Sequence, residues 1–216
     1  MKKIEVLIAD DHTIIRDGLK QILADTGDIV VAGEAANGHA ALEQVRARDW
    51  DVLVLDLSMP GKNGLDLIKQ IKADKPALPI LILSMHSEEQ YAMRTLRAGA
   101  AGYLNKESDS ELLVAVIRKI AGGGIYVSAL LAEQMARDRM PQAEHLPHTL
   151  LSEREYQVFL MIVSGQGLTE IGETLSLSVK TISTHKTRIL QKMSMTNQAE
   201  LIRYAIAHRL VEPSAP

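Results

Sequence analysis

Five short apolar segments alternate with five longer segments of helical periodicity over residues 1–124. The short segments are rich in Val, Ile and Leu and are bounded by turn residues, as expected of strands that are buried on both faces. The predicted strands are Ile4–Ala9, Ile29–Glu34, Val52–Leu55, Ile80–Leu83 and Gly102–Leu104. The predicted helices are Thr13–Ala24, Gly38–Ala47, Gly64–Ala73, Glu88–Ala98 and Asp109–Ala121. This alternation predicts right-handed βαβ units, and therefore an α/β fold with a doubly wound, five-stranded parallel sheet.

The chain changes character after the Gly122-Gly-Gly124 triplet. Ile125–Ala136 predicts one more short helix, and residues 137–149 have no apolar periodicity and contain two Pro, which is typical of a linker. From Leu150 onward the pattern is helical, with predicted helices at 152–163, 168–175, 178–193 and 197–208. The first of these helices opens on Ser152-Glu-Arg-Glu155, which has the spacing of a capping box. We therefore expect a first domain at 1–124, a short helix and linker at 125–149, and a small all-α domain at 150–212.

Composition excludes several classes of protein. No apolar run approaches the ~18 residues of a transmembrane helix. The N-terminal segment makes a poor signal peptide, because Glu5 interrupts its short apolar run. The chain has no Cys, which excludes disulfides and thiolate metal sites and favours a reducing compartment. Its seven His are scattered without the spacing of metal ligands. We expect a cytoplasmic protein with no membrane partner.

Three carboxylates follow two of the predicted strands. Asp10 and Asp11 come directly after the first strand, and Asp56 comes directly after the third. In a sheet of order 2-1-3-4-5 the strand order reverses between these two strands, where α/β sheets bind their ligands. Carboxylates that converge there would repel one another, and Mg²⁺ prefers a few carboxylates together with water and phosphate oxygens. The pattern predicts a Mg²⁺ site.

Two further polar residues follow predicted strands. Ser84 ends the fourth segment, and Lys106 follows the fifth, three positions after Tyr103. Taken singly, Ser84 fits a loop hydroxyl, Lys106 a surface cation, Tyr103 a packed aromatic and Asp56 an ordinary turn residue. A hydroxyl and an ammonium beside a metal-bound carboxylate instead suit the oxygens of a phosphoryl group. Their common location at strand ends favours the second interpretation.

This set, with Met59-Pro60-Gly61 after Asp56, resembles the receiver domain of bacterial response regulators over residues 1–124. The resemblance implies a CheY-like fold in which Asp56 accepts a phosphoryl group from a sensor histidine kinase. It implies that Asp11, Asp56 and the backbone carbonyl of Ser58 bind Mg²⁺, with Asp10 acting through water. Ser84 and Lys106 would contact the phosphoryl oxygens, and Tyr103 would respond as an aromatic switch.

A basic helix is expected in the C-terminal domain. No acidic residue lies between Glu173 and Glu200, whereas Lys180, Lys186, Arg188 and Lys192 do. The helices predicted at 168–175 and 178–193, joined by a short turn, have the proportions of a helix-turn-helix. A solvated amphipathic helix, with Val179, Ile182, Ile189, Leu190 and Met193 as its apolar stripe, is the alternative. Solvated faces usually mix charges of both signs, so the missing acids favour nucleic-acid binding.

Residues Leu151-Ser-Glu-Arg-Glu155 through Leu177–Ile182 and His185–Asn197 resemble the LuxR-type helix-turn-helix. Behind a receiver, this resemblance implies a response regulator of the NarL/FixJ class, which binds promoter DNA as a homodimer when phosphorylated. RNA polymerase is a candidate further partner. By position, the predicted base-facing residues are Ser183, Thr184 and Thr187. The predicted phosphate-contacting residues are Lys180, Thr181, Lys186, Arg188 and Lys192.

Two other functions fit parts of the chain. A Mg²⁺-dependent phosphotransferase or phosphatase would also use an Asp nucleophile, but the haloacid-dehalogenase type places a second Asp where this chain has Ser58, and no general acid stands out. A LuxR-type sensor of a small acyl ligand would lack the five-strand carboxylate pattern. A phosphorylation-controlled transcription factor, rather than an enzyme, is therefore the main hypothesis.

Overall fold

The computed structural model describes residues 3–59, 64–85, 88–138, 146–175, 177–208 and 210–211. The chain divides into two compact units, Met1–Arg137 and Asp138–Pro216, and this division falls within the predicted segment 125–149. Among the described residues, no helix has both the length and the apolar content needed to cross a bilayer.

The first unit is built on a parallel sheet of five strands in the order β2-β1-β3-β4-β5. The strands are β1 (Ile4–Ala9), β2 (Ile29–Ala35), β3 (Val52–Leu55), β4 (Ile80–Ser84) and β5 (Gly102–Asn105). Every residue of β3 and β4 is buried, which explains the unbroken apolar runs Val52–Leu55 and Ile80–Leu83. The predicted fold class and strand order are confirmed.

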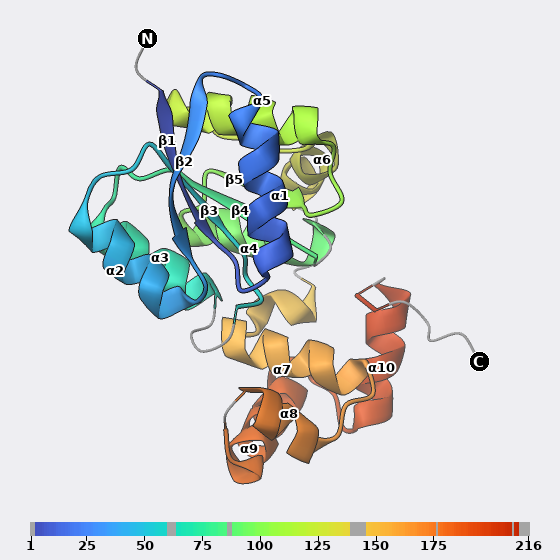
Figure 1. Cartoon of the computed structure of the whole chain (residues 1–216). Helices are drawn as coiled ribbons and strands as arrows, with labels where there is room; N and C mark the ends of the chain where they lie inside the picture. Colours follow the sequence, from blue (N-terminus) through green and yellow to red (C-terminus); the bar gives the residue numbers. More distant parts are fainter. Residues whose placement is uncertain are drawn as a thin grey trace. The chain divides into compact units, whose positions relative to one another are not determined.

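Helices cover both faces of this sheet (Figure 1). They are α1 (Thr13–Ala24), α2 (Gly38–Ala47), α3 (Gly64–Asp74), α4 (Glu88–Ala98) and α5 (Ser110–Ala121). One core cluster joins α1 and α5 to the alternate strand residues that include Val6, Ile8 and Val54. Leu7, Leu53 and Leu55 are also completely buried and, by strand alternation, point to the opposite face.

The helix predicted at Ile125–Ala136 begins later, as α6 (Ala129–Asp138). The amide of Tyr126 donates instead to the carbonyl oxygen of Ala101 at 2.8 Å, which holds this segment beside β5. The Ser128 hydroxyl then accepts from the amide of Leu131 at 3.1 Å and caps the helix. Most of the predicted linker, residues 139–145, lies outside the described residues, as do Pro60, Gly61 and the turn residue Ser176.

The second unit is helical, with a 3₁₀ turn η1 (Pro147–Leu150) followed by α7 (Glu153–Val163), α8 (Leu168–Leu175), α9 (Val179–Lys192) and α10 (Gln198–Ala207). Side chains cap three of these helices: Ser152 forms a capping box with Glu155, Ser178 caps α9 and Asn197 caps α10. The core side chains include Tyr156, Phe159, Ile171, Ile182, Ile189 and Leu201. Val179 was expected in the apolar stripe of α9, but it is 45% exposed, because it is the first residue of the helix.

Candidate functional site

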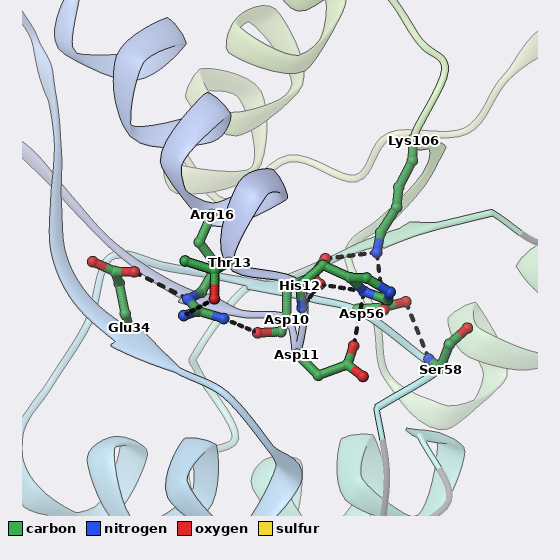
Figure 2. Close-up of polar contacts among 9 residues, drawn as sticks. All are labelled: Asp10, Asp11, His12, Thr13, Arg16, Glu34, Asp56, Ser58 and Lys106. Carbon is green, nitrogen blue, oxygen red and sulfur yellow. Dashed lines mark hydrogen bonds and ion pairs between the residues drawn. The ribbon is translucent and has the colours of Figure 1, made fainter.

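The carboxylates of Asp10, Asp11 and Asp56 gather at the carboxyl ends of β1 and β3, as Figure 2 shows. These strands are neighbours in the sheet, and the Asp56 amide donates to the Ala9 carbonyl oxygen at 2.9 Å. The hydrogen bonds between β1 and β3 therefore bring the ends of both strands to the same edge of the sheet, where the Asp residues follow. Asp10 and Asp56 are each only 2% exposed, so the fold holds two carboxylates almost out of water.

Lys106, which follows β5, lies between the two buried carboxylates. Its Nζ is 2.6 Å from Asp10 Oδ2 and 2.9 Å from Asp56 Oδ2, and its side chain is 6% exposed. Burial lowers the pKa of Lys106, but the hydrogen bonds to Asp10 and Asp56 outweigh burial and hold its pKa above the ordinary value. Lys106 is thus a buried, charged group and not the surface cation of the alternative interpretation.

His12 joins the cluster although its residue type did not single it out. Its backbone amide donates to Asp10 Oδ1 at 2.8 Å, and its Nδ1 lies 3.2 Å from Asp10 Oδ1 and 3.0 Å from Asp11 Oδ1. The Asp11 Oδ1 atom is buried and takes part in no hydrogen bond of acceptable geometry. The only sequence signal for His12 was its position directly after the two Asp residues.

The donor set fits a hard divalent cation. Asp10, Asp11 and Asp56 carry three formal negative charges and Lys106 carries one positive charge, which leaves a formal charge of −2. One ligand atom from each Asp and from His12 can be chosen so that all lie within 4.8 Å of one another. The buried Asp11 Oδ1 atom makes an ion-pair contact with His12 but accepts no hydrogen bond, and such an atom is the kind that a cation would satisfy.

Asp56 has its two carboxylate oxygens in different surroundings. Oδ2 accepts from Lys106, whereas Oδ1 accepts from the backbone amide of Ser58 at 3.1 Å. The Ser58 contact is an Asx turn, which fixes the carboxylate relative to its own loop. The predicted role of the Ser58 carbonyl in binding Mg²⁺ stays a prediction.

Ser84 and Tyr103 lie on the adjacent strands β4 and β5. Both are almost completely buried, at 0% and 1% exposure. Burial raises the pKa of Tyr103, and a side-chain hydrogen bond with Ser84 opposes this only in part. The Lys106 amide donates to the Ser84 carbonyl oxygen at 2.9 Å, so Ser84 and Lys106 are tied together at the same edge.

Arg16 of α1 contacts the backbone of the carboxylate cluster. Its Nη1 donates to the Asp10 carbonyl oxygen at 2.8 Å, and its Nε lies 3.0 Å from Glu34 Oε2 (Figure 2). Glu34 also pairs with Lys20 at 2.8 Å. Sequence reasoning missed Arg16 and Glu34, because Glu34 lies within a strand and Arg16 within an ordinary amphipathic helix.

The α9 residues predicted to contact DNA are mostly accessible in the second unit. Those classed as exposed are Lys180, Ser183, Thr184, Thr187, Arg188 and Lys192, and those classed as half-buried are Thr181 and Lys186. The hydroxyls of Thr184 and Thr187 donate to the carbonyl oxygens one turn back, at 3.0 and 3.1 Å. Their oxygens can still accept a hydrogen bond, and their methyl groups remain available for apolar contact.

Two lysines of α9 have partners inside the unit. Lys186 Nζ donates to Gln198 Oε1 at 2.7 Å, and this amide is neutral, so the positive charge of Lys186 is not balanced by it. Lys192 Nζ donates to Glu155 Oε2 at 2.6 Å, and Glu155 is 4% exposed. The sequence places Lys192 among the candidate phosphate contacts of α9, and in the structure its ammonium pairs with a buried carboxylate.

Comparison with protein families supports two domains. Residues 6–118 match the response regulator receiver domain, and residues 149–205 match the luxR family of bacterial regulatory proteins. The response regulator UvrY of Escherichia coli is 38% identical over 208 residues, which cover 96% of this chain and 95% of UvrY. The response regulator GacA of Pseudomonas viridiflava is 37% identical over 213 residues, which cover 98% of this chain and 100% of GacA.

Solved structures give the same result. RcsB of Salmonella typhimurium has a TM-score of 0.71 at 29% identity, covering 94% of this chain and 97% of RcsB. RcsB of Salmonella enterica serovar Typhimurium, bound to the promoter rprA with the phosphomimetic BeF₃⁻, has a TM-score of 0.66 at 29% identity and covers 94% of this chain and 98% of RcsB. The chain therefore belongs to the NarL/FixJ class of two-component response regulators, which join a receiver domain to a LuxR-type DNA-binding domain.

Proposed function

We propose that phosphorylation of Asp56 by a sensor histidine kinase controls the binding of α9 to promoter DNA. The observation that carries this proposal is the cluster of three carboxylates around the buried side chain of Lys106. Such a site is suited to accept a dianionic phosphoryl group, provided that a cation offsets the acids. Receiver domains bind Mg²⁺ at an acidic pocket of this kind.

The chemistry follows from the residues at the sheet edge. A carboxylate oxygen of Asp56 attacks the phosphorus of a phosphohistidine, the phosphorus–nitrogen bond breaks, and the imidazole leaves with its electron pair. Asp10, Asp11 and the Ser58 carbonyl would hold Mg²⁺ with Asp56, and the ion would neutralise the phosphoryl oxygens. Lys106 is within reach of Asp56 and can pair with the new phosphoryl charge.

Ser84 and Tyr103 would convert this charge into a conformational change. The Ser84 hydroxyl is now engaged with Tyr103. If the phosphoryl group on Asp56 recruits that hydroxyl, the Tyr103 side chain must find another partner or position. This coupling would change the surface of the receiver next to β5, and with it either the dimerisation of the receiver or its hold on the DNA-binding domain.

In DNA recognition, α9 would enter the major groove as the second helix of a helix-turn-helix. Lys180, Thr181, Lys186 and Arg188 would contact phosphates, and Ser183, Thr184 and Thr187 would contact base edges. The basic surface of α9 and its lack of acidic residues support this arrangement. A homodimer formed on phosphorylation would present two such helices to half-sites about one helical turn apart. RNA polymerase is a candidate partner at the promoter.

The phosphoacceptor is tested with acetyl phosphate and Mg²⁺, followed by intact mass measurement. The native chain should gain one phosphoryl group, and Asp56→Asn should gain none. Asp17→Asn is a matched control, since Asp17 is 61% exposed on α1 and has no place in the cluster. Full labelling of Asp56→Asn would exclude Asp56 as the acceptor.

A further inference from the structure

The first turn of α7 contacts the carboxyl-terminal ends of both helices of the helix-turn-helix. Two consecutive residues make these contacts, Arg154 toward α8 and Glu155 toward α9. The sequence suggested only a capping box here, which is a local feature of α7. The long-range contacts give the same residues a second role.

Glu155 is buried, and its carboxylate accepts hydrogen bonds from two different elements. Its Oε2 accepts from the Ser152 amide at 2.8 Å, which completes the capping box, and from Lys192 Nζ at 2.6 Å. Burial acts to raise the pKa of Glu155, but the hydrogen bonds from Lys192 and Ser152 outweigh burial and hold its pKa below the ordinary value. Glu155 is therefore ionised at neutral pH, and its charge is balanced by Lys192.

Arg154 contacts the other helix. Its Nη2 donates to the carbonyl oxygen of Leu175 at 3.0 Å, while its Nη1 donates to Gln157 Oε1 at 2.7 Å. Leu175 is the last residue of α8, and the carbonyl groups of a final helical turn lack partners within their own helix. Arg154 therefore caps α8 with a charged donor at the negative end of that helix.

We propose that Arg154 and Glu155 are positioning residues that set the orientation of α9 against α8, and that Lys192 serves this clamp rather than a DNA phosphate. This inference rests on the proposed function of α9 as the helix that contacts DNA. Lys180 and Arg188 would then supply the phosphate contacts that Lys192 does not.

The orientation of α9 matters most for recognition of the DNA base sequence. The predicted base-facing residues, Ser183, Thr184 and Thr187, have short side chains that reach a base only at close range. A small change in the tilt of α9 would take them out of range, whereas long Lys and Arg side chains can follow the phosphates. Loss of the clamp should therefore reduce specificity more than it reduces total affinity.

The first test compares the salt dependence of binding to a random duplex by full-length variants. Lys180→Gln should reduce the slope of log affinity against log salt by about one unit, because one phosphate contact is lost. Lys192→Gln should leave the slope unchanged, because the Lys192 ammonium is paired with Glu155 and contacts no phosphate. A loss for Lys192→Gln as large as that for Lys180→Gln would overturn the inference. Unchanged slopes for both Lys180→Gln and Arg188→Gln would instead overturn the proposed function of α9.

The second test uses Glu155→Gln, which can retain the capping box but not the charge pair. This variant frees Lys192, so its slope on random DNA should increase by about one unit. Its preference for the specific site should fall about tenfold, the equivalent of one base contact. An unchanged slope and an unchanged preference would contradict the clamp. If Glu155→Gln does not fold, as judged by circular dichroism, the Lys192→Gln comparison decides the question.

The third test separates positioning by Arg154 from simple stability. Arg154→Lys keeps a cationic donor for the Leu175 carbonyl, and it should recover most of the site preference that Arg154→Gln loses. Equal losses of preference in the two variants would exclude capping of α8 as the role of Arg154. Binding to random DNA is the internal control, because a misfolded domain would lose affinity for both duplexes.

Discussion

In the part of the chain that the structure describes, two places bury carboxylates and pair them with lysine, and their charges are balanced differently. At the sheet edge, Lys106 contacts Asp10 and Asp56, and Asp11 stands beside them. At the start of α7, Lys192 contacts Glu155 alone. Lys106 is 6% exposed and Lys192 is 42% exposed, so the lysine with more acidic neighbours is also the more deeply buried.

The two places differ in the net charge that remains after the carboxylates are paired with lysine. At α7 one carboxylate meets one ammonium and a backbone amide, which satisfies the charge and leaves nothing for a ligand. At the sheet edge three carboxylates meet one ammonium, and an Asp11 oxygen has no hydrogen bond. A satisfied buried pair holds elements in place, whereas a cluster with an excess of buried negative charge favours the binding of an external cation. Under the two proposals above, similar residues serve as a structural clamp in one unit and as a phosphoacceptor site in the other.

Of the changes that test this comparison, removal of Lys106 should have the largest effect on stability. Without Mg²⁺, Lys106→Ala should lower the free energy of unfolding of the first unit by roughly 3–5 kcal/mol, because it leaves buried carboxylates unpaired. Urea unfolding followed by the fluorescence of Trp50, the single Trp of the chain, measures this unit. Lys192→Ala should leave the Trp50 transition unchanged. Equal shifts of this transition in both variants would contradict the assignment of the two lysines to separate clusters.

The same Lys106→Ala variant also tests the response to phosphorylation. We expect it to bind Mg²⁺, since all three carboxylates remain, but to lose the gain in DNA affinity that phosphorylation gives. The measurement is fluorescence anisotropy on a specific duplex with and without BeF₃⁻. If the gain persists at its native size, Lys106 does not couple phosphorylation to conformation.

Addition of Mg²⁺ should have the next largest effect, and only on the unbalanced cluster. At a Mg²⁺ concentration about 100 times the dissociation constant, the first unit should gain about 2.7 kcal/mol. Asp11→Asn should abolish most of this gain, whereas Glu155→Gln should preserve it. Stabilisation of Asp11→Asn equal to that of the native chain would remove Asp11 from the cation site.

Glu155 should have a smaller effect on stability. Glu155→Gln should destabilise the second unit by about 1 kcal/mol, because the hydrogen bond to Ser152 survives and only the charged part of the contact is lost. Amide exchange of α7 and α9 measures this locally in the full-length chain. Glu200→Gln is a suitable control, since the Glu200 carboxylate accepts its hydrogen bonds from the amide and hydroxyl of Thr196, at the start of α10. A similar loss of protection in α7 for both variants would mean that Glu155 has no special role.

Acidification should produce the smallest effect, through His185 of α9. Burial, together with the nearby charge of Arg154, lowers the pKa of His185, whose Nδ1 is buried without a hydrogen bond. Below pH 6.5 the unfolded chain gains a proton that the folded chain resists. The stability due to neutral His185 is therefore complete above pH 6.5 and is lost as the pH falls through the lower folded-state pKa.

The check is amide exchange in α9 at pH 7.5 and pH 5.5, corrected for the intrinsic exchange rate. Protection should fall at the lower pH in the native chain, and the fall should be reduced in His185→Gln. Glu155 cannot cause this change, because its pKa is already below its ordinary value of 4.5. An identical fall in both proteins would exclude His185 as the cause.

The sequence by itself determined the sheet and the place of its reactive edge. Alternating apolar runs and helical segments leave few topologies, and parallel strands bring Asp10 and Asp56 to one edge without any side-chain detail. The capping box of Ser152 and Glu155 was equally readable, because its two residues lie within one turn and their spacing alone defines the contact.

Only the tertiary structure decided which charges meet. Glu155 and Lys192 are 37 positions apart, and Lys106 and Asp56 are 50 apart, so each contact depends on how whole elements pack. Periodicity tells which face of a helix is apolar, but it does not give the angle at which two helices cross or the reach of a side chain at their ends. For this reason Lys192 counted as a candidate phosphate contact in the sequence. Arg16 and the Arg154 cap on α8 gave no recognisable signal, and His12 gave only its position directly after Asp10 and Asp11.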